Sequence, residues 1–170
     1  MHAGMTPHYG EGFAGTGADE AHINTVLGLR DGVVGTAWAT ALVSPSVGHV
    51  PFVVVHSPNL PVMPFTLFVN KATIDGDRHG RLTWGAAQAG VAAGVIDALE
   101  SKLFDRWGRL DTLALITAVW VNPAAAQEEL VYANNRNATL AAITMGMAGG
   151  PPLDRLRTAG EPNNPFFRIS

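Results

Sequence analysis

Two long stretches of the chain repeat apolar residues at the three- to four-residue spacing of a helix. The first covers residues 84–102 and the second covers residues 124–147. A third, alanine-rich stretch at 33–43 ends at Ser44-Pro45, and proline cannot continue a helix. The spacing therefore predicts a helix in each of these three ranges.

Four shorter runs are rich in β-branched residues and predict strands, at 20–27, 49–56, 65–74 and 112–121. The run at 49–56 is apolar enough to be buried on both faces. Residues 1–17 contain five glycines and predict a loose arm with one short strand. Strands interspersed with helices predict an α/β (α+β) domain, in which a mixed sheet and its helices form two layers.

Two of the predicted strands carry a pair of polar residues on one face. The period of two in a strand places His22 with Asn24, and Lys71 with Thr73. Each residue also has a structural explanation, because a lone strand histidine commonly bonds a backbone carbonyl and a lysine at a strand end commonly extends to solvent. Two polar pairs in otherwise apolar strands nevertheless predict a cleft.

The composition limits the classes of function. Eleven Lys and Arg against fourteen Asp and Glu give a net charge of −3, which excludes a generic binder of nucleic acid or anionic membrane. Charged residues make up 15% of the chain and hydrophobic residues 47%. Because so few charges are available to solvate the whole surface of a monomer, we expect a homo-oligomer that buries part of its surface. The chain has no cysteine, which excludes disulfides and thiolate chemistry. It has no export signal and no membrane-spanning run, which predicts a cytoplasmic protein.

Common motifs for nucleotide, zinc and hydrolase sites are missing from the sequence. There is no GxxxxGK, HExxH or GxSxG, and no two of the six histidines are four residues apart. Asp75 and Asp77 lie in a glycine-containing turn, where solvation explains them. We therefore expect no metal site.

An ordered series of short motifs runs through about residues 10–148. The motifs are Gly17-Ala18-Asp19-Glu20-Ala21-His22-Ile23-Asn24, Gly35-Thr36-Ala37, Gly48-His49, Pro58-Asn59-Leu60-Pro61 with Pro64, Thr66-Leu67, Asn70-Lys71-Ala72-Thr73-Ile74, Gly85-Ala86-Ala87-Gln88 and Asn137-Ala138-Thr139. This series resembles the formaldehyde-activating enzyme family, without a gap between His22 and Gln88.

The resemblance implies a fold like domain 2 of ribosomal protein S5 and a homopentamer with its active site between subunits. It also implies a hydro-lyase of one-carbon metabolism, found in methylotrophy, which condenses formaldehyde with tetrahydromethanopterin to 5,10-methylenetetrahydromethanopterin and water. The pterin is a co-substrate, and no metal takes part. Some relatives are fused to a hexulose-phosphate synthase, and this chain is expected to be the stand-alone form. Residues 1–148 would form the domain, and residues 149–170 a tail that is disordered or docks on a neighbouring subunit.

The resemblance also assigns roles to individual residues. His22 falls on the general acid of the family, and imidazole suits this role because it titrates near neutral pH. The positions that contact the pterin correspond to Asn24, Val53, Lys71, Thr73 and Gln88.

Several positions depart from the family pattern. Asn24 replaces an aspartate, Asn137 a glutamate, Val53 a leucine and Asn122 a histidine. Because two carboxylates have become amides, two functions stay open. One is the condensation, and the alternative is a non-catalytic paralogue that binds the pterin or a formaldehyde adduct as carrier or sensor. A third hypothesis is a paralogue for a different aldehyde or amine cofactor.

Overall fold

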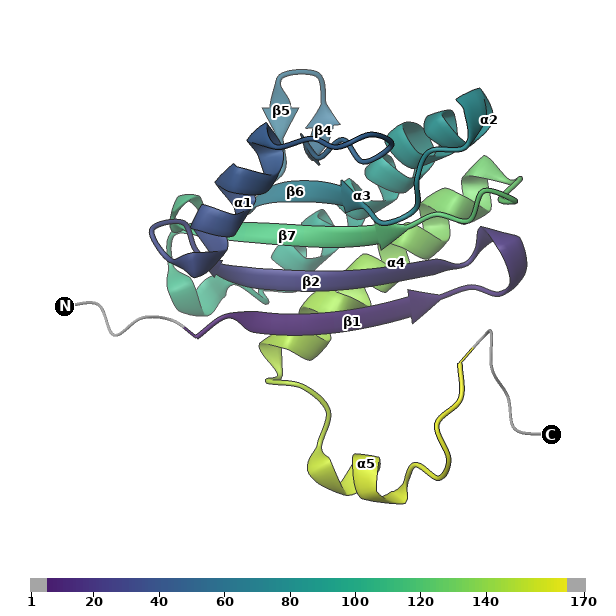
Figure 1. Ribbon diagram of the computed structural model, residues 1–170. Helices are drawn as coiled ribbons and strands as arrows, with labels where there is room; N and C mark the ends of the chain where they lie inside the picture. The colour runs from purple at the N-terminus through teal and green to yellow at the C-terminus, as the bar shows by residue number, and fades with distance from the viewer. Residues whose placement is uncertain (1–5, 165–170) are drawn as a thin grey trace.

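A five-stranded mixed sheet forms the centre of the computed structural model, which describes residues 6–164 (Figure 1). The strand order is β1-β2-β7-β6-β3, where β6 and β7 are parallel and the other neighbours antiparallel. The strands are β1 (His8–Ala14), β2 (Ala21–Leu29), β3 (Phe52–Val53), β6 (Phe65–Asn70) and β7 (Leu113–Trp120). A separate two-stranded sheet pairs β4 (Val55–Ser57) with β5 (Leu60–Pro61).

Helices pack on both faces of the sheet, with α3 and α4 on one face and α1 on the other. In Figure 1, α3 and α4 lie behind the sheet, whereas α1 lies in front of one end of it. The helices are α1 (Val33–Val43), α2 (Gly76–Arg81), α3 (Gln88–Glu100), α4 (Glu128–Met147) and α5 (Leu153–Thr158), with a π-helix at Leu82–Ala87 and 3₁₀ turns at Gly17–Asp19, Asp105–Trp107 and Leu110–Thr112. The predicted two-layer α/β fold is confirmed.

The main core lies between the sheet and the helices α3 and α4. Ile23 and Leu27 of β2 are buried there with Val91 of α3 and Ala138 of α4. Because side chains alternate along a strand, the even-numbered residues of β2 lie on the opposite face. That opposite face, which we call the open face, is the one that α1 covers at one end only.

The short strand predicted within the N-terminal arm is confirmed at residues 8–14, but this part of the arm is not loose, because it forms an edge strand packed on α4. Gly10 and Gly12 allow this close packing. A Cβ at Gly10 would lie 1.8 Å from the carbonyl oxygen of Ala142, and one at Gly12 would lie 2.0 Å from that of Ala138. The glycines therefore mark a helix–strand contact rather than flexibility. Residues 1–5 of the predicted arm lie outside the described residues.

The predicted strand at 49–56 is instead divided into β3 and β4, and its residues are mostly half-buried. The chain changes partner at Val54. The Val54 N–H donates to the Thr66 carbonyl on one side, and the Val54 carbonyl accepts from Val62 on the other. Pro51, which has no N–H, precedes the short paired segment.

The predicted strand at 65–74 ends early, at Asn70, because this side chain folds the chain back. Asn70 Nδ2 donates to the carbonyls of Gly48 and Ala72, at 2.8 and 2.9 Å. Lys71 and Thr73 therefore follow the strand rather than continue it.

The other predicted elements differ from the structure only at their ends. The helix at 33–43 is confirmed, as are the strands at 20–27 and 112–121 within two residues. The helix predicted at 84–102 begins earlier, with α2 at Gly76, and passes through the π-helix. The helix predicted at 124–147 begins at Glu128, after a turn in which Ala125 N–H donates to the carbonyl of Asn122.

The C-terminal tail contains one short helix, α5, whose residues are exposed. Residues 165–170 of the predicted tail lie outside the described residues. Among residues 6–164, no helix combines the length and the apolar character needed to cross a membrane.

Candidate active site

Polar side chains of β2 lie on the open face of the sheet. His22 pairs with Phe13 of β1 and Trp120 of β7, and Asn24 pairs with Glu11 and Ala118. Residues directly opposite each other in antiparallel strands share a face. The structure therefore places His22 and Asn24 side by side, as the period of two predicted.

Lys71 joins this group from the end of β6. Its backbone N–H donates to the Val119 carbonyl at 2.8 Å, which extends the parallel pairing by one residue. Its Nζ then donates to Asn24 Oδ1 at 3.2 Å. The lysine and the asparagine thus form a polar pair beside His22, and the structure brings together three of the predicted site residues.

The bond from Lys71 also orients the Asn24 amide. Since Oδ1 accepts from the ammonium, the Nδ2 group turns away from Lys71 with two donors. No described residue accepts a hydrogen bond from these donors. An aspartate at this position would offer an acceptor there instead.

Glu11 is a site residue that the sequence analysis missed. Its Oε1 lies 3.2 Å from His22 Nε2, and the two side chains are 48% and 43% exposed. The signal was present in the alternation of large and small residues from Tyr9 to Phe13, which indicates a strand with Glu11 on its outer face. The glycines between them suggested a flexible arm instead.

Thr73 lies near the group but binds a different histidine. Its hydroxyl is 3.1 Å from His49 Nε2, and His49 Nδ1 is 2.8 Å from the carbonyl oxygen of Asn70. A carbonyl only accepts, so Nδ1 carries the hydrogen and, in the neutral ring, Nε2 accepts from Thr73. This pair fixes the turn that follows β6.

Val53 and Gln88 lie apart from the His22 group. Val53 pairs with Leu67, four residues before Lys71 and hence about 13 Å from it along the strand. Gln88 Oε1 accepts from the backbone N–H of Val55 at 2.7 Å. One chain therefore does not gather all six predicted residues in one place.

Val53 instead lines a cavity of about 480 Å³ between α1 and the end of the sheet. Arg30, Trp38 and Phe65 are further lining residues. The Trp38 Nε1–H is buried without a hydrogen-bond acceptor among the described residues, and the Arg30 guanidinium lies 5.1 Å from the centroid of the Phe65 ring. The cavity is thus mainly apolar, with one N–H donor and one cation.

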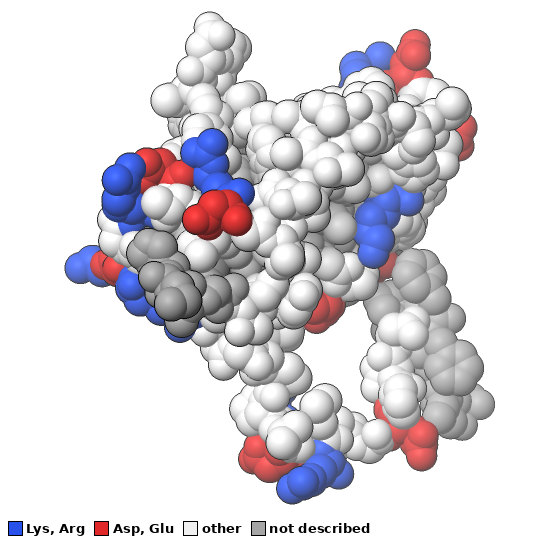
Figure 2. All heavy atoms as spheres, turned by 60° about the vertical axis from the view of Figure 1, so that its left-hand side comes forward, with Lys and Arg blue, Asp and Glu red and all other residues white. Residues whose placement is uncertain are grey.

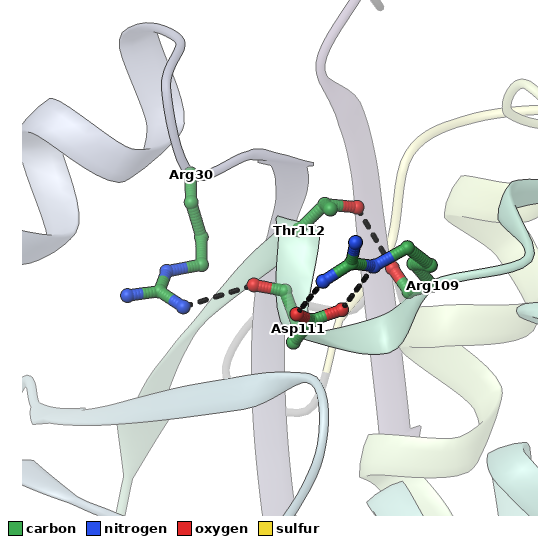
Figure 3. Close-up of polar contacts among 4 residues, drawn as sticks. All are labelled: Arg30, Arg109, Asp111 and Thr112. Atoms are coloured by element: carbon green, nitrogen blue, oxygen red, sulfur yellow. Dashed lines mark hydrogen bonds and ion pairs between the residues drawn. The ribbon is translucent and has the colours of Figure 1, made fainter.

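A polar network fixes Arg30 at the rim of this cavity (Figure 3). Its Nη1 donates to the Asp111 carbonyl at 2.9 Å. The hydrogen bond from Arg109, with Nε 3.0 Å from Oδ1, holds the pKa of the Asp111 carboxyl below its usual value. The Thr112 hydroxyl donates to the carbonyl of Arg109 at 2.7 Å and closes the turn.

The other two amide substitutions lie in the turn after β7 and on α4. Asn122 Oδ1 accepts from the Ala124 N–H at 2.9 Å, so it stabilises the turn before α4. Asn137 is exposed on α4, the helix that packs behind the sheet. Within residues 6–164, no group of three or more His, Asp or Glu side chains is placed to hold a metal ion.

A family model and individual relatives of known name both match this chain, and they agree on the family. The model of the family described as "Formaldehyde-activating enzyme (Fae)" matches residues 9–166. A 5,6,7,8-tetrahydromethanopterin hydro-lyase of Methanosarcina barkeri is 35% identical over 158 residues, which cover 92% of this chain and 88% of that protein.

Larger relatives contain a matching segment. The bifunctional enzyme Fae/Hps of Methanococcoides burtonii is 35% identical over 145 residues, which cover 85% of this chain and 36% of the relative. The same values hold for the bifunctional enzyme of Archaeoglobus fulgidus. The chain thus spans about a third of the length of these bifunctional relatives. From the match over residues 9–166 we conclude that this chain belongs to the formaldehyde-activating enzyme family.

Proposed function

We propose that the protein condenses formaldehyde with tetrahydromethanopterin to 5,10-methylenetetrahydromethanopterin and water, as a cytoplasmic enzyme without a metal. The observation that carries the proposal is the group on the open face, in which His22 lies beside the Asn24–Lys71 pair. The hydro-lyase name of the Methanosarcina barkeri relative supports the substrate class.

The chemistry needs one well-placed acid. A pterin amine adds to formaldehyde to give a carbinolamine, whose C–O bond must then break. Protonated His22 gives its proton to the hydroxyl, water leaves with the electron pair of that bond, and an iminium forms. The second amine of the pterin attacks the iminium carbon and loses its own proton. General acid catalysis of this kind contributes about 10² to 10⁴ in rate.

The remaining polar groups suit the recognition of the pterin. Lys71 supplies a positive charge and Asn24 supplies two free N–H donors, which fit carbonyl oxygens and ring nitrogens. Thr73, Val53 and Gln88 are proposed as further contacts. The family aspartate would accept from pterin N–H groups at the Asn24 position, so the change to an amide alters which edge of the ligand is recognised.

A complete site requires a second copy of the chain in this proposal. In one chain, Val53 and Gln88 lie away from His22, and among residues 6–164 the helix α1 covers one end of the open face only. Tyr9 and Phe13 on that face are 66% and 39% exposed. Figure 2 shows charged side chains confined to clusters, with a wide uncharged area between them. We propose a homopentameric ring in which neighbouring subunits complete the site.

The loss of a carboxylate at position 24 supports a second candidate function. Without that charge the protein could hold the pterin or a formaldehyde adduct as a carrier or sensor and not accelerate the condensation. The contact between His22 and Glu11 favours the enzyme over this alternative, because a carboxylate still faces the imidazole.

Calorimetry followed by an assay tests the two candidates. Tetrahydromethanopterin should bind with one site per subunit, and formaldehyde consumption should exceed the spontaneous rate of a protein-free control. Binding without acceleration would select the carrier, and no binding would reject both candidates.

Light scattering tests the ring independently. We expect a mass near five times the 17.9 kDa of one chain at micromolar concentration. A monomer would contradict the proposal that the site lies between subunits.

A further inference from the structure

Glu11 approaches His22 from the neighbouring edge strand. Glu11 pairs in register with Asn24, and His22 pairs with Phe13, so Glu11 and His22 are diagonal neighbours on the open face. The carboxylate oxygen Oε1 lies 3.2 Å from Nε2. The backbone of β1 is held by the close packing of Gly10 and Gly12 on α4, which fixes the strand position from which the Glu11 side chain extends.

We propose that Glu11 is a positioning residue for His22 and that it assigns the two ring nitrogens to different tasks. A carboxylate accepts hydrogen bonds, so Nε2 keeps its hydrogen toward Glu11. Nδ1 is then the nitrogen that carries the transferred proton and gives it to the leaving hydroxyl. This assignment rests on the proposed function, in which His22 is the acid.

The charges around His22 support this assignment. Glu11 on β1 is the negative group in contact with the imidazole, and the positive group of the site, Lys71 at the end of β6, contacts the neighbouring Asn24. The paired residues of β7, Trp120 and Ala118, carry no charge. Asn24 stands between the two charged side chains and is neutral, so Glu11 supplies the carboxylate that stabilises the imidazolium.

The proton balance is simple. Before the step, His22 holds hydrogens on Nδ1 and Nε2. The Nδ1 proton moves to the carbinolamine oxygen, water leaves, and the iminium takes the positive charge. His22 is left as the neutral Nε2–H tautomer, hydrogen-bonded to Glu11, and a proton from solvent or from the second pterin amine restores Nδ1. Glu11 stays ionised throughout.

Nitrogen-15 NMR of the histidine-labelled full-length protein tests the assignment without any ligand. A His22→Gln variant identifies the His22 signals. We expect the Nε2–H tautomer in the neutral natural protein and a mixture of both tautomers in Glu11→Gln. An Nδ1–H tautomer in the natural protein, or no change in Glu11→Gln, would overturn the proposal.

The rate gives the second readout. Glu11→Gln should lower kcat by about tenfold, less than the loss of the acid itself. Glu11→Asp, which keeps the carboxylate on a shorter side chain, should recover part of kcat.

A control variant completes the test, and the combined results distinguish a failure of the proposed function from a failure of the positioning role. Glu100→Gln removes an exposed carboxylate at the end of α3 and should change neither readout. If the natural protein shows no turnover while Glu11→Gln still redistributes the tautomers, the proposed function fails and the positioning role stands. If the protein turns over and kcat of Glu11→Gln is unchanged, the positioning role fails alone.

Discussion

Asp19 and Gln127 are joined by hydrogen bonds across 108 positions of the sequence. Asp19 Oδ1 accepts the backbone N–H of Gln127 at 3.0 Å and that of Ala126 at 2.7 Å. Gln127 is the residue before α4, so the Asp19 carboxylate satisfies backbone donors at the start of this helix. The contact ties the turn before β2 to the helix that covers the core.

Asp19→Ala should therefore destabilise the protein. The loss of a capping side chain costs about 1–2 kcal/mol in free energy of unfolding. We expect the melting temperature to fall by several degrees in calorimetry, with Glu161→Ala, an exposed carboxylate, as the control. Equal melting temperatures for the two variants would show that the Asp19 bonds contribute nothing.

The same contact predicts a pH dependence of stability. The backbone hydrogen bond from Gln127 is the main cause that lowers the pKa of Asp19 below 3.8, against the opposing effect of burial. Because the pKa is lowered in the folded state, the ionised Asp19 carboxylate contributes its full share of the free energy of unfolding above about pH 5. This contribution is lost as the pH falls through 3.8 and below. Denaturant titrations should show the difference between the natural protein and Asp19→Asn shrinking over that acid range.

Gly12→Ala should test the packing of β1 on α4. The new Cβ would lie 2.0 Å from the Ala138 carbonyl oxygen and 2.7 Å from the Ala142 nitrogen, so the strand or helix must shift. Overpacking of this kind costs about 1–3 kcal/mol. Gly85→Ala is the control, because its Cβ would meet open space. If both variants unfold at the same denaturant concentration as the natural protein, the strand is not tightly packed.

His22→Ala should separate catalysis from binding. A general acid acts mainly in the transition state, so kcat should fall by about 10² or more while the pterin Kd changes only several-fold. Steady-state kinetics and calorimetry measure the two quantities. Weaker binding with an unchanged kcat would make His22 a ligand contact.

Asn24→Asp should raise kcat, most clearly near and above neutral pH. A carboxylate at this position favours the protonated form of His22. Because Glu11 already supplies one negative charge, the gain should be larger in the Glu11→Gln background, which a double-mutant cycle of kcat measures. Asn163→Asp, an exposed change in the C-terminal segment, is the control. A variant that folds and binds pterin without acceleration would favour the carrier.

Local sequence patterns were sufficient to predict several features of the structure. The helix at 33–43 ends where Ser44-Pro45 prevents its continuation, and the shared face of His22 and Asn24 follows from the period of a strand. These features depend on residues close together in the chain. The series of family motifs likewise indicated the family that the match over residues 9–166 confirms.

Contacts between segments far apart in the sequence decided the remaining features of the fold and of the candidate site. From the sequence, Gly10 and Gly12 predict a flexible arm. In the structure they allow β1 to pack closely on α4, and this strand places Glu11 beside His22. The Lys71–Asn24 bond needs β7 to pair with β2 on one side and β6 on the other. The sequence determined which side chains share a strand face, because that depends on backbone geometry. The tertiary structure decided which strands are neighbours, because pairing and packing join residues that are far apart in the chain.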